Sequence, residues 1–251
     1  MAGPTFDGTK VGKFPIGITV SPFSATLKSI YQKANYNINY TDLESILNSI
    51  TEEAVEHWNK RLEVKAFELR VPSIQNNGGA FDCALGENNI VVYPYIYAET
   101  PLSMGGTLKW FKNESGDQYS PTPSNFSSTP SKFPFPINSG TVKINFFALD
   151  KKFSEMVVQH TVNSVKSVPH STVNVDGIKK AIGTDDFTVN GWSYLFTVIH
   201  ELGHVLGLDH TDDTRSVMYK GFNHLVHKPY SEKKLELSSI DIGPVKELYQ
   251  L

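Results

Sequence analysis

Hydrophobic residues recur at helical spacing in two long segments of the chain. The first segment begins near Thr41, and its apolar residues are spaced three or four positions apart, which predicts an amphipathic helix packed against a sheet. These residues are Leu43, Ile46, Leu47, Ile50, Ala54, Val55 and Trp58. The second segment covers about residues 190–206, and its dense apolar positions predict a mostly buried helix. The pattern therefore predicts two long helices that are far apart in the sequence.

Alternation of apolar and polar residues predicts strands around these helices. The clearest case is Phe67, Leu69 and Val71, which alternate with Glu68 and Arg70. Predicted strands cover residues 35–40, 64–71, 89–98, 106–112 and 141–147. Pro94 lies within one of them and indicates an edge strand or a bulge, because proline cannot donate to a neighbouring strand.

Two segments lack a clear pattern. Residues 113–140 are rich in Ser, Pro, Asn and Thr and form either a surface insertion or a lid or binding loop. Residues 1–34 contain several prolines and are either an extension packed on the domain or the remnant of an inhibitory pro-segment. Asp7 is the only aspartate of this segment and the only candidate there for blocking a metal.

Composition narrows the classes of protein and partner. With 251 residues and 39% hydrophobic residues, the chain is long enough for one globular domain with its own core. A net charge of −3 favours a polypeptide partner and gives no reason to expect binding to nucleic acid. The sequence has no apolar run of the roughly 20 residues that a membrane span needs. Cys83 is the one cysteine, so no intrachain disulfide can form.

The segment from His200 to His210 contains the residues of a metal site. His200 and His204 are four residues apart on the predicted helix, which places their side chains on one face about 5–6 Å apart. His210 would lie about 9 Å beyond His204 if the helix continued at 1.5 Å per residue, which is too far to share an ion. Gly207 resolves this difficulty, because glycine commonly ends helices in the left-handed conformation and lets the chain turn back.

Three imidazoles leave a fourth position of a zinc ion open, which is typical of a catalytic site. Glu201 lies about 100° around the helix from His200, so it is better placed to take a proton from water than to bind the metal. We therefore predict zinc ligands at His200, His204 and His210 and a general base at Glu201 for peptide-bond hydrolysis. The alternative, that these are ordinary helix residues, is disfavoured by their joint spacing.

The pattern HExxHxxGxxH resembles the metzincin zinc endopeptidases, and Ser216-Val217-Met218-Tyr219 is similar to their Met-turn. The resemblance implies that Met218 forms a hydrophobic floor beneath the metal and that Tyr219 borders the substrate pocket. Residues 237–249 are similar to the last helix of the matrixin branch. Matrixins usually have two adjacent acids there and a proline after the Met-turn tyrosine, whereas this chain has Ile240-Asp241 and Lys220.

The matrixin resemblance implies an α+β metzincin fold, with a twisted and mostly parallel sheet, two long helices and a small C-terminal subdomain with a final helix. We expect a catalytic domain over residues 35–251, divided into an upper subdomain (35–207) and a lower one (208–251). The resemblance further implies a secreted, monomeric metalloendopeptidase that cleaves proteins or peptides. A catalytically weak or inactive binding or toxin module and a zinc amidase stay open as alternatives. The remaining histidines do not show the spacing of a second zinc site, and calcium, common in the family, has no clear loop motif here.

Overall fold

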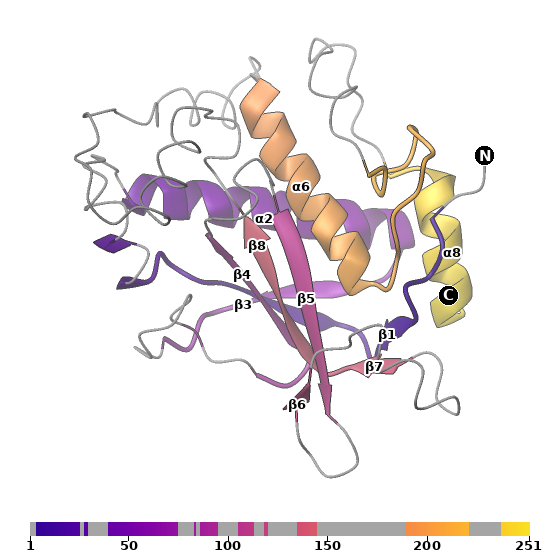
Figure 1. Ribbon diagram of the computed structural model, residues 1–251, viewed down its shortest axis with the longest axis horizontal. Coiled ribbons are helices and arrows are strands. Elements are labelled where there is room, and N and C mark those ends of the chain that lie inside the picture. The colour runs from indigo at the N-terminus through magenta and orange to yellow at the C-terminus, as the bar shows by residue number, and fades with distance from the viewer. Residues whose placement is uncertain are drawn as a thin grey trace, which may run out of the picture.

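A six-stranded mixed sheet forms the centre of the molecule, in the strand order β3-β2-β4-β8-β5-β6 (Figure 1). The neighbours β3, β2, β4 and β8 run parallel, whereas β5 is antiparallel to β8 and β6 is antiparallel to β5. The strands are β2 (Ile16–Val20), β3 (Phe67–Arg70), β4 (Asn89–Pro94), β5 (Gly105–Lys112), β6 (Gln118–Tyr119) and β8 (Ser139–Ile144). The computed structural model describes residues 4–25, 28–29, 40–74, 83, 86–94, 105–112, 118–119, 135–144, 189–220 and 237–251.

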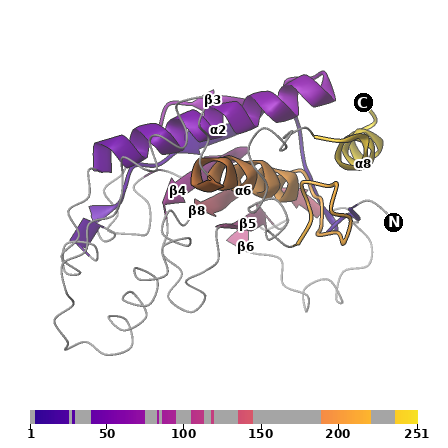
Figure 2. The ribbon, with the colours of Figure 1, turned by 90° about the horizontal axis from the view of Figure 1, so that it is seen from above.

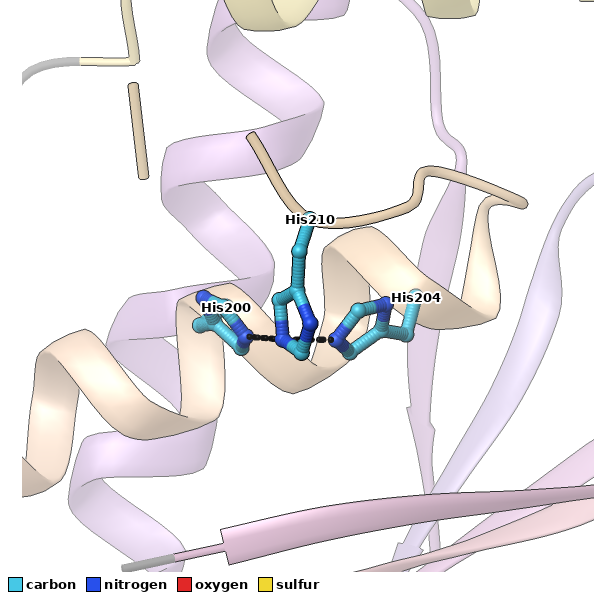
Figure 3. A group of neighbouring side chains, drawn as sticks. All are labelled: His200, His204 and His210. Atoms are coloured by element: carbon cyan, nitrogen blue, oxygen red, sulfur yellow. Dashed lines mark hydrogen bonds between the residues drawn. The ribbon is translucent and has the colours of Figure 1, made fainter. Parts of the chain in front are cut away.

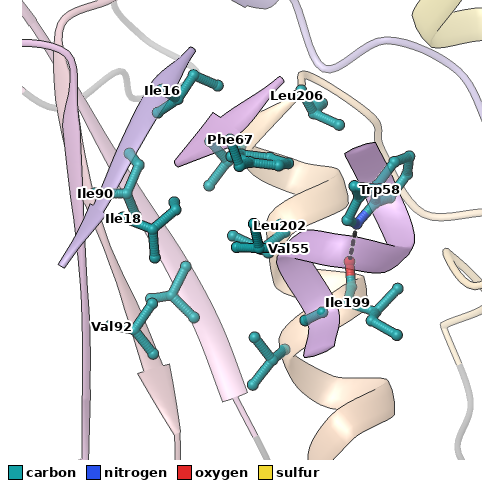
Figure 4. Packing of buried hydrophobic residues seen from close by; sticks show 14 of the residues in the cluster. Ile16, Ile18, Val55, Trp58, Phe67, Ile90, Val92, Ile199, Leu202 and Leu206 are labelled. Atoms are coloured by element: carbon teal, nitrogen blue, oxygen red, sulfur yellow. Dashed lines mark hydrogen bonds between the residues drawn. The ribbon is translucent and has the colours of Figure 1, made fainter. Parts of the chain in front are cut away.

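Two long helices, α2 (Tyr40–Leu62) and α6 (Val189–Val205), pack together against the sheet (Figure 2). Figure 4 shows side chains of β2 and β4 pointing toward both helices, so the main core lies between this face of the sheet and the helix pair. The buried indole N–H of Trp58 on α2 donates to the carbonyl oxygen of Ile199 on α6 at 3.0 Å. A third helix, α8 (Ser239–Tyr249), closes the described chain near its C-terminus. None of the described helices is both long enough and apolar enough to cross a membrane.

The N-terminal segment contributes an inner strand to the sheet. Strand β2 lies between β3 and β4 and is buried along its whole length. The expectation of an extension over residues 1–34 is therefore wrong for Ile16–Val20, which belong to the sheet. The strand expected at 35–40 falls largely on residues outside the described ones, and Tyr40 begins α2.

The other predicted strands are placed with one correction. Strands β3, β4, β5 and β8 fall on the predicted strands: β3 begins three residues later than predicted, and the other described ends differ by one or two residues at most. Residues 95–98 and 145–147 lie outside the described parts. Strand β4 is an inner strand, so the edge position inferred from Pro94 is wrong. Pro94 is tolerated because it is the last residue of β4, and pairing with β2 already ends at Val92. Within the expected 113–140 loop, β6 pairs with β5, and β7 (Phe135–Ile137) pairs in parallel with β1 (Thr9–Val11).

Candidate metal centre

Three histidine side chains meet at the C-terminal end of α6. The Nε2 atom of His210 lies 3.1 Å from Nε2 of His200 and 3.2 Å from Nε2 of His204. Figure 3 shows the rings of His200 and His204 projecting from the helix and the ring of His210 reaching them from the following segment. His200 is buried, His204 is half-buried and His210 is exposed, so the cluster opens to solvent on the His210 side. The structure thus brings together the three residues that the sequence predicted as ligands.

Backbone carbonyls fix the proton positions of two of these rings. Nδ1 of His200 lies 2.7 Å from the carbonyl oxygen of Val217, and Nδ1 of His204 lies 2.7 Å from that of Leu208. A carbonyl only accepts, so each Nδ1 carries the proton and each Nε2 presents a lone pair to the cluster centre. Tetrahedral zinc with Zn–N bonds of about 2.0–2.1 Å needs nitrogens about 3.3–3.4 Å apart. The chemistry and the spacing of the cluster therefore fit a zinc ion.

Burial keeps the two helical imidazoles neutral. It lowers the pKa of His200 to about 3, with a smaller contribution from His204, and lowers the pKa of His204 to about 4. A neutral imidazole is the form that binds a metal ion. Both rings are consequently ready to bind a cation at neutral pH.

The helix ends in a left-handed turn that returns the chain to the cluster. Gly207 has φ 93°, its N–H donates to the carbonyl of His204 at 3.0 Å, and the Leu208 N–H donates to the carbonyl of Gly203 at 3.1 Å. These two bonds form a Schellman motif, which satisfies the last helix carbonyls and reverses the chain direction. The predicted role of Gly207 as the residue that ends the helix agrees with this geometry.

Glu201 is buried next to strand β5. Its Oε2 accepts a 2.6 Å hydrogen bond from the Thr107 hydroxyl. A Cβ placed on Gly105 would lie 3.1 Å from Glu201 Oε1 and 2.5 Å from Thr197 Cγ2, so a glycine lets the strand approach the helix this closely. Burial raises the pKa of Glu201 to about 7, although the Thr107 hydrogen bond and the Lys109 charge oppose the shift. A carboxylate with such a pKa is suited to exchange protons near neutral pH.

Met218 is completely buried and packs against the middle of the histidine motif. A Cβ placed on Gly203 would lie 2.4 Å from Met218 Sδ and 3.3 Å from Trp58 Cζ2, so the absence of a side chain at Gly203 makes room for the thioether. Gly203 is not among the residues predicted for the site. A glycine inside a helix of apolar residues lowers the stability of the helix and usually has a packing reason. This pattern was the one sequence signal that could have indicated the contact with Met218.

Asp241 connects the final helix to the Met-turn. Its buried Oδ1 accepts hydrogen bonds from the Ser216 hydroxyl and, at 3.1 Å, from the Val217 N–H. Its Oδ2 accepts from the N–H and the hydroxyl of Ser238 at 3.1 and 2.9 Å, which caps α8. The carbonyl of Val217 in turn contacts His200 Nδ1, so the single acid of Ile240-Asp241 supports the His200 ring through the backbone of Val217.

Other predicted residues stand further from the cluster. The backbone of Tyr219 bridges to Thr211, but residues 221–236 lie outside the described ones, so the pocket role of Tyr219 stays a prediction. Asp7 was the candidate for blocking the metal, but its carboxylate instead accepts hydrogen bonds from Thr9 and Lys109. Cys83 is a buried free thiol. His57 faces Glu53 at 3.8 Å on α2, and His160, His170, His224 and His227 lie outside the described residues.

Comparison with known proteins agrees with the motif and the histidine cluster. The sequence model of the matrixin family matches residues 109–250, which is more than half of the chain. A protein of Spodoptera frugiperda ascovirus 1a, provisionally named as a matrix metalloproteinase, is 40% identical over 57 residues. That alignment covers 23% of this chain and 14% of the viral protein, so it spans only a small part of the relative. On the family match, the chain belongs to the matrixins, a family of zinc metalloproteases.

Proposed function

We propose that the chain is a zinc-dependent endopeptidase, with His200, His204 and His210 as the metal ligands and Glu201 as the general base. The observation that carries this proposal is the convergence of three Nε2 atoms, two of which must present lone pairs because their Nδ1–H groups face carbonyls. Nε2 of His210 lies 3.1 and 3.2 Å from these two atoms, and a cation among the three nitrogens is a partner that all three lone pairs can share. The buried carboxylate of Glu201 follows His200 directly in the helix, within the same site.

Bound zinc supplies Lewis-acid chemistry, which polarises the scissile carbonyl and acidifies the attacking water. Glu201 accepts the proton that this water loses and delivers it to the leaving amine, so no covalent enzyme intermediate is required. Thr107 holds one oxygen of Glu201, which limits the rotation of the carboxylate and leaves Oε1 for the proton transfer. The His200 and His204 rings keep fixed orientations through their carbonyl partners.

Strand β5 is the element that would bind the substrate backbone. Strand β6 pairs only with Phe111 and Lys112, so no described strand lies beside residues 106–110 on that edge. The same stretch contacts Glu201 through Thr107, which places this edge next to the proposed base. An extended peptide can add to such an edge through main-chain hydrogen bonds, with side-chain pockets setting the preference.

Cleavage of a mixed peptide library with and without a chelator tests the proposal. We expect cleavage that the chelator abolishes and zinc restores. Glu201→Gln should retain zinc and fold but lose cleavage, whereas His204→Ala should lose zinc as well. Glu52→Gln, which removes an exposed carboxylate from α2, is the matched control and should cleave normally.

The same assay separates the alternatives. A zinc-loaded protein that cleaves no peptide would favour a binding or toxin module, and turnover of non-peptide amides alone would favour a zinc amidase. Full cleavage by Glu201→Gln would refute the role of the base while leaving the metal ligands in place.

A further inference from the structure

Lys109 carries a buried ammonium group at the end of the metal-binding helix. Its side chain points from β5 toward α6, and its Nζ donates to the carbonyl of His204 and to the Thr9 hydroxyl, each at 2.8 Å. Its third partner is the carboxylate of Asp7. The residue is only 9% exposed. Its three acceptors lie on three different elements: His204 on α6, Thr9 on β1 and Asp7 in the segment before β1. An ammonium has three N–H donors, so this set matches its full capacity.

Lys109 is the last of three alternate residues of β5 that contact α6. Gly105, Thr107 and Lys109 share one face of the strand, because alternate residues point the same way. Gly105 lies against Glu201 and Thr197, Thr107 donates to Glu201, and Lys109 donates to His204. Two strand residues advance about 6.7 Å. The matching helix steps are four residues from Thr197 to Glu201 and three from Glu201 to His204, about 6 and 4.5 Å, so the contacts of strand and helix advance together. The strand thus contacts the proposed base through Thr107 and a proposed ligand through Lys109, two residues further along.

The N-terminal segment holds the turn that leads from α6 to His210. The Asp7 N–H donates to the Gly207 carbonyl at 2.9 Å, and the Asp209 N–H donates to the Thr5 carbonyl at 2.7 Å. Between these bonds, Phe6 and Leu208 form an antiparallel bridge. The turn is therefore attached on one side to residues 5–7, and Lys109 ties those residues back to the helix.

We propose that Lys109 is a positioning residue that fixes the end of α6, and hence the relative placement of His204 and His210, by joining the His204 carbonyl to Asp7 of the N-terminal segment. This inference rests on the proposed function for its effect on catalysis. A cation near the last helix carbonyls is also favourable, because the negative end of the helix dipole lies there. Residues 5–9 then form part of the metal site, although they lie outside the segment matched by the matrixin family.

The alternative is that Lys109 and Asp7 form an ion pair that matters only for stability. Two variants separate the possibilities. Lys109→Met removes the ammonium but leaves the Asp7 carboxylate without its charged partner, so it should lose both stability and metal placement. The double variant Asp7→Asn/Lys109→Met also removes that carboxylate charge, so stability should recover, but the His204 carbonyl still lacks its ammonium donor.

The measurements are the zinc dissociation constant, by competition with a chromogenic chelator, the thermal midpoint of the metal-free protein, and kcat and KM for a peptide from the library. We expect both variants to raise the zinc dissociation constant and lower kcat by about 10-fold, at the lower end of the effect of outer-shell residues, with KM within about twofold. The double variant should regain the thermal midpoint lost in Lys109→Met. Lys246→Met, which removes an exposed ion pair with Glu63, is the control and should match the unmodified chain.

Recovery of zinc affinity together with the thermal midpoint in the double variant would overturn the proposal, because Lys109 would then act only through its ion pair. Unchanged zinc affinity in Lys109→Met would overturn it as well. If the unmodified chain cleaves no peptide, the proposed function fails, but the zinc dissociation constants still decide the role of Lys109.

Discussion

The contact between Gly203 and Met218 allows a prediction in which one substitution changes sign. Gly203 is buried in α6, and a methyl group at this position would lie 2.4 Å from Met218 Sδ, 3.3 Å from Met218 Cε and 3.3 Å from Trp58 Cζ2. Met218 is completely buried, so its sulfur cannot move into solvent to relieve the contact. Gly203→Ala should therefore force the thioether to repack.

Two opposing contributions set the size of the effect. Overpacking a tight core costs about 1–3 kcal/mol, whereas alanine is favoured over glycine in a helix interior by about 1 kcal/mol. Gly203→Ala alone should accordingly lower the free energy of unfolding by about 0–2 kcal/mol. Met218→Ala removes a buried side chain and should cost about 2–5 kcal/mol. In the Met218→Ala background the sulfur is absent, so Gly203→Ala should stabilise the protein by up to about 1 kcal/mol.

Urea unfolding of the four proteins of this double-mutant cycle, treated with a chelator, measures the coupling. Removal of metal is essential, because zinc binding would add its own contribution to the free energy of unfolding. We expect a favourable coupling of about 1–3 kcal/mol between the two substitutions. Effects of Gly203→Ala that agree within about 0.5 kcal/mol in both backgrounds would refute the packing argument.

Three further predictions concern the supports of the site. Asp241→Asn should lower the free energy of unfolding, measured by urea unfolding, by about 2–4 kcal/mol, because an amide cannot accept hydrogen bonds from all four donors of Ser216, Val217 and Ser238. Glu247→Gln, which changes an exposed residue of the same helix, is the control and should change the free energy of unfolding by less than about 0.5 kcal/mol. The raised pKa of Glu201, about 7, means that the folded metal-free protein holds a proton which the unfolded chain releases above its ordinary value of 4.5. This contribution to stability is present below pH 4.5 and is lost as the pH rises to about 7, so the stability gained by Glu201→Gln should grow by about 3 kcal/mol across that interval; a gain that is independent of pH would contradict it. Gly207 has φ 93°, and a Cβ at this position would lie only 2.4 Å from the Thr9 carbonyl oxygen. Gly207→Ala should therefore destabilise the metal-free protein by more than about 2 kcal/mol and weaken zinc binding in a chelator competition. Unchanged zinc affinity would count against the role of the turn.

The helices could be predicted from the sequence because their signal is long and local. Both α2 and α6 repeat an apolar pattern over several turns, which leaves little ambiguity. Strand β2 has only five residues, and its alternation of Ile16, Ile18 and Val20 lies between Pro15 and Pro22, which favoured an irregular segment. Its place in the sheet depends on pairing with β3 and β4, tens of residues away, and no local pattern records such pairing.

The meeting of the three histidines could also be predicted, because helix geometry fixes the relation of His200 to His204 and glycine marks the turn. The residues that support them could not. Thr107 and Lys109 are polar residues at alternate positions of a strand, a pattern that normally indicates the solvent face. In the structure this face is turned inward, because Glu201 and the His204 carbonyl offer acceptors to the hydroxyl and the ammonium. The partners are about a hundred residues apart in the sequence, so only the fold reveals them.

The histidine motif is therefore necessary for the site, but its residues are positioned by other segments of the chain. Helix α6 by itself positions His200 and His204, and the position of His210 depends on the turn after Gly207. That turn is held by the N-terminal segment through Asp7, while Asp241 on α8 holds the Met-turn whose Val217 carbonyl orients His200. The helix is itself held against α2 by Trp58 and against the sheet by the inward face of β5. Because the N-terminal segment, α2 and Thr107 precede residue 109, the matrixin-like segment 109–250 contains all three histidines but lacks several of the groups that place them.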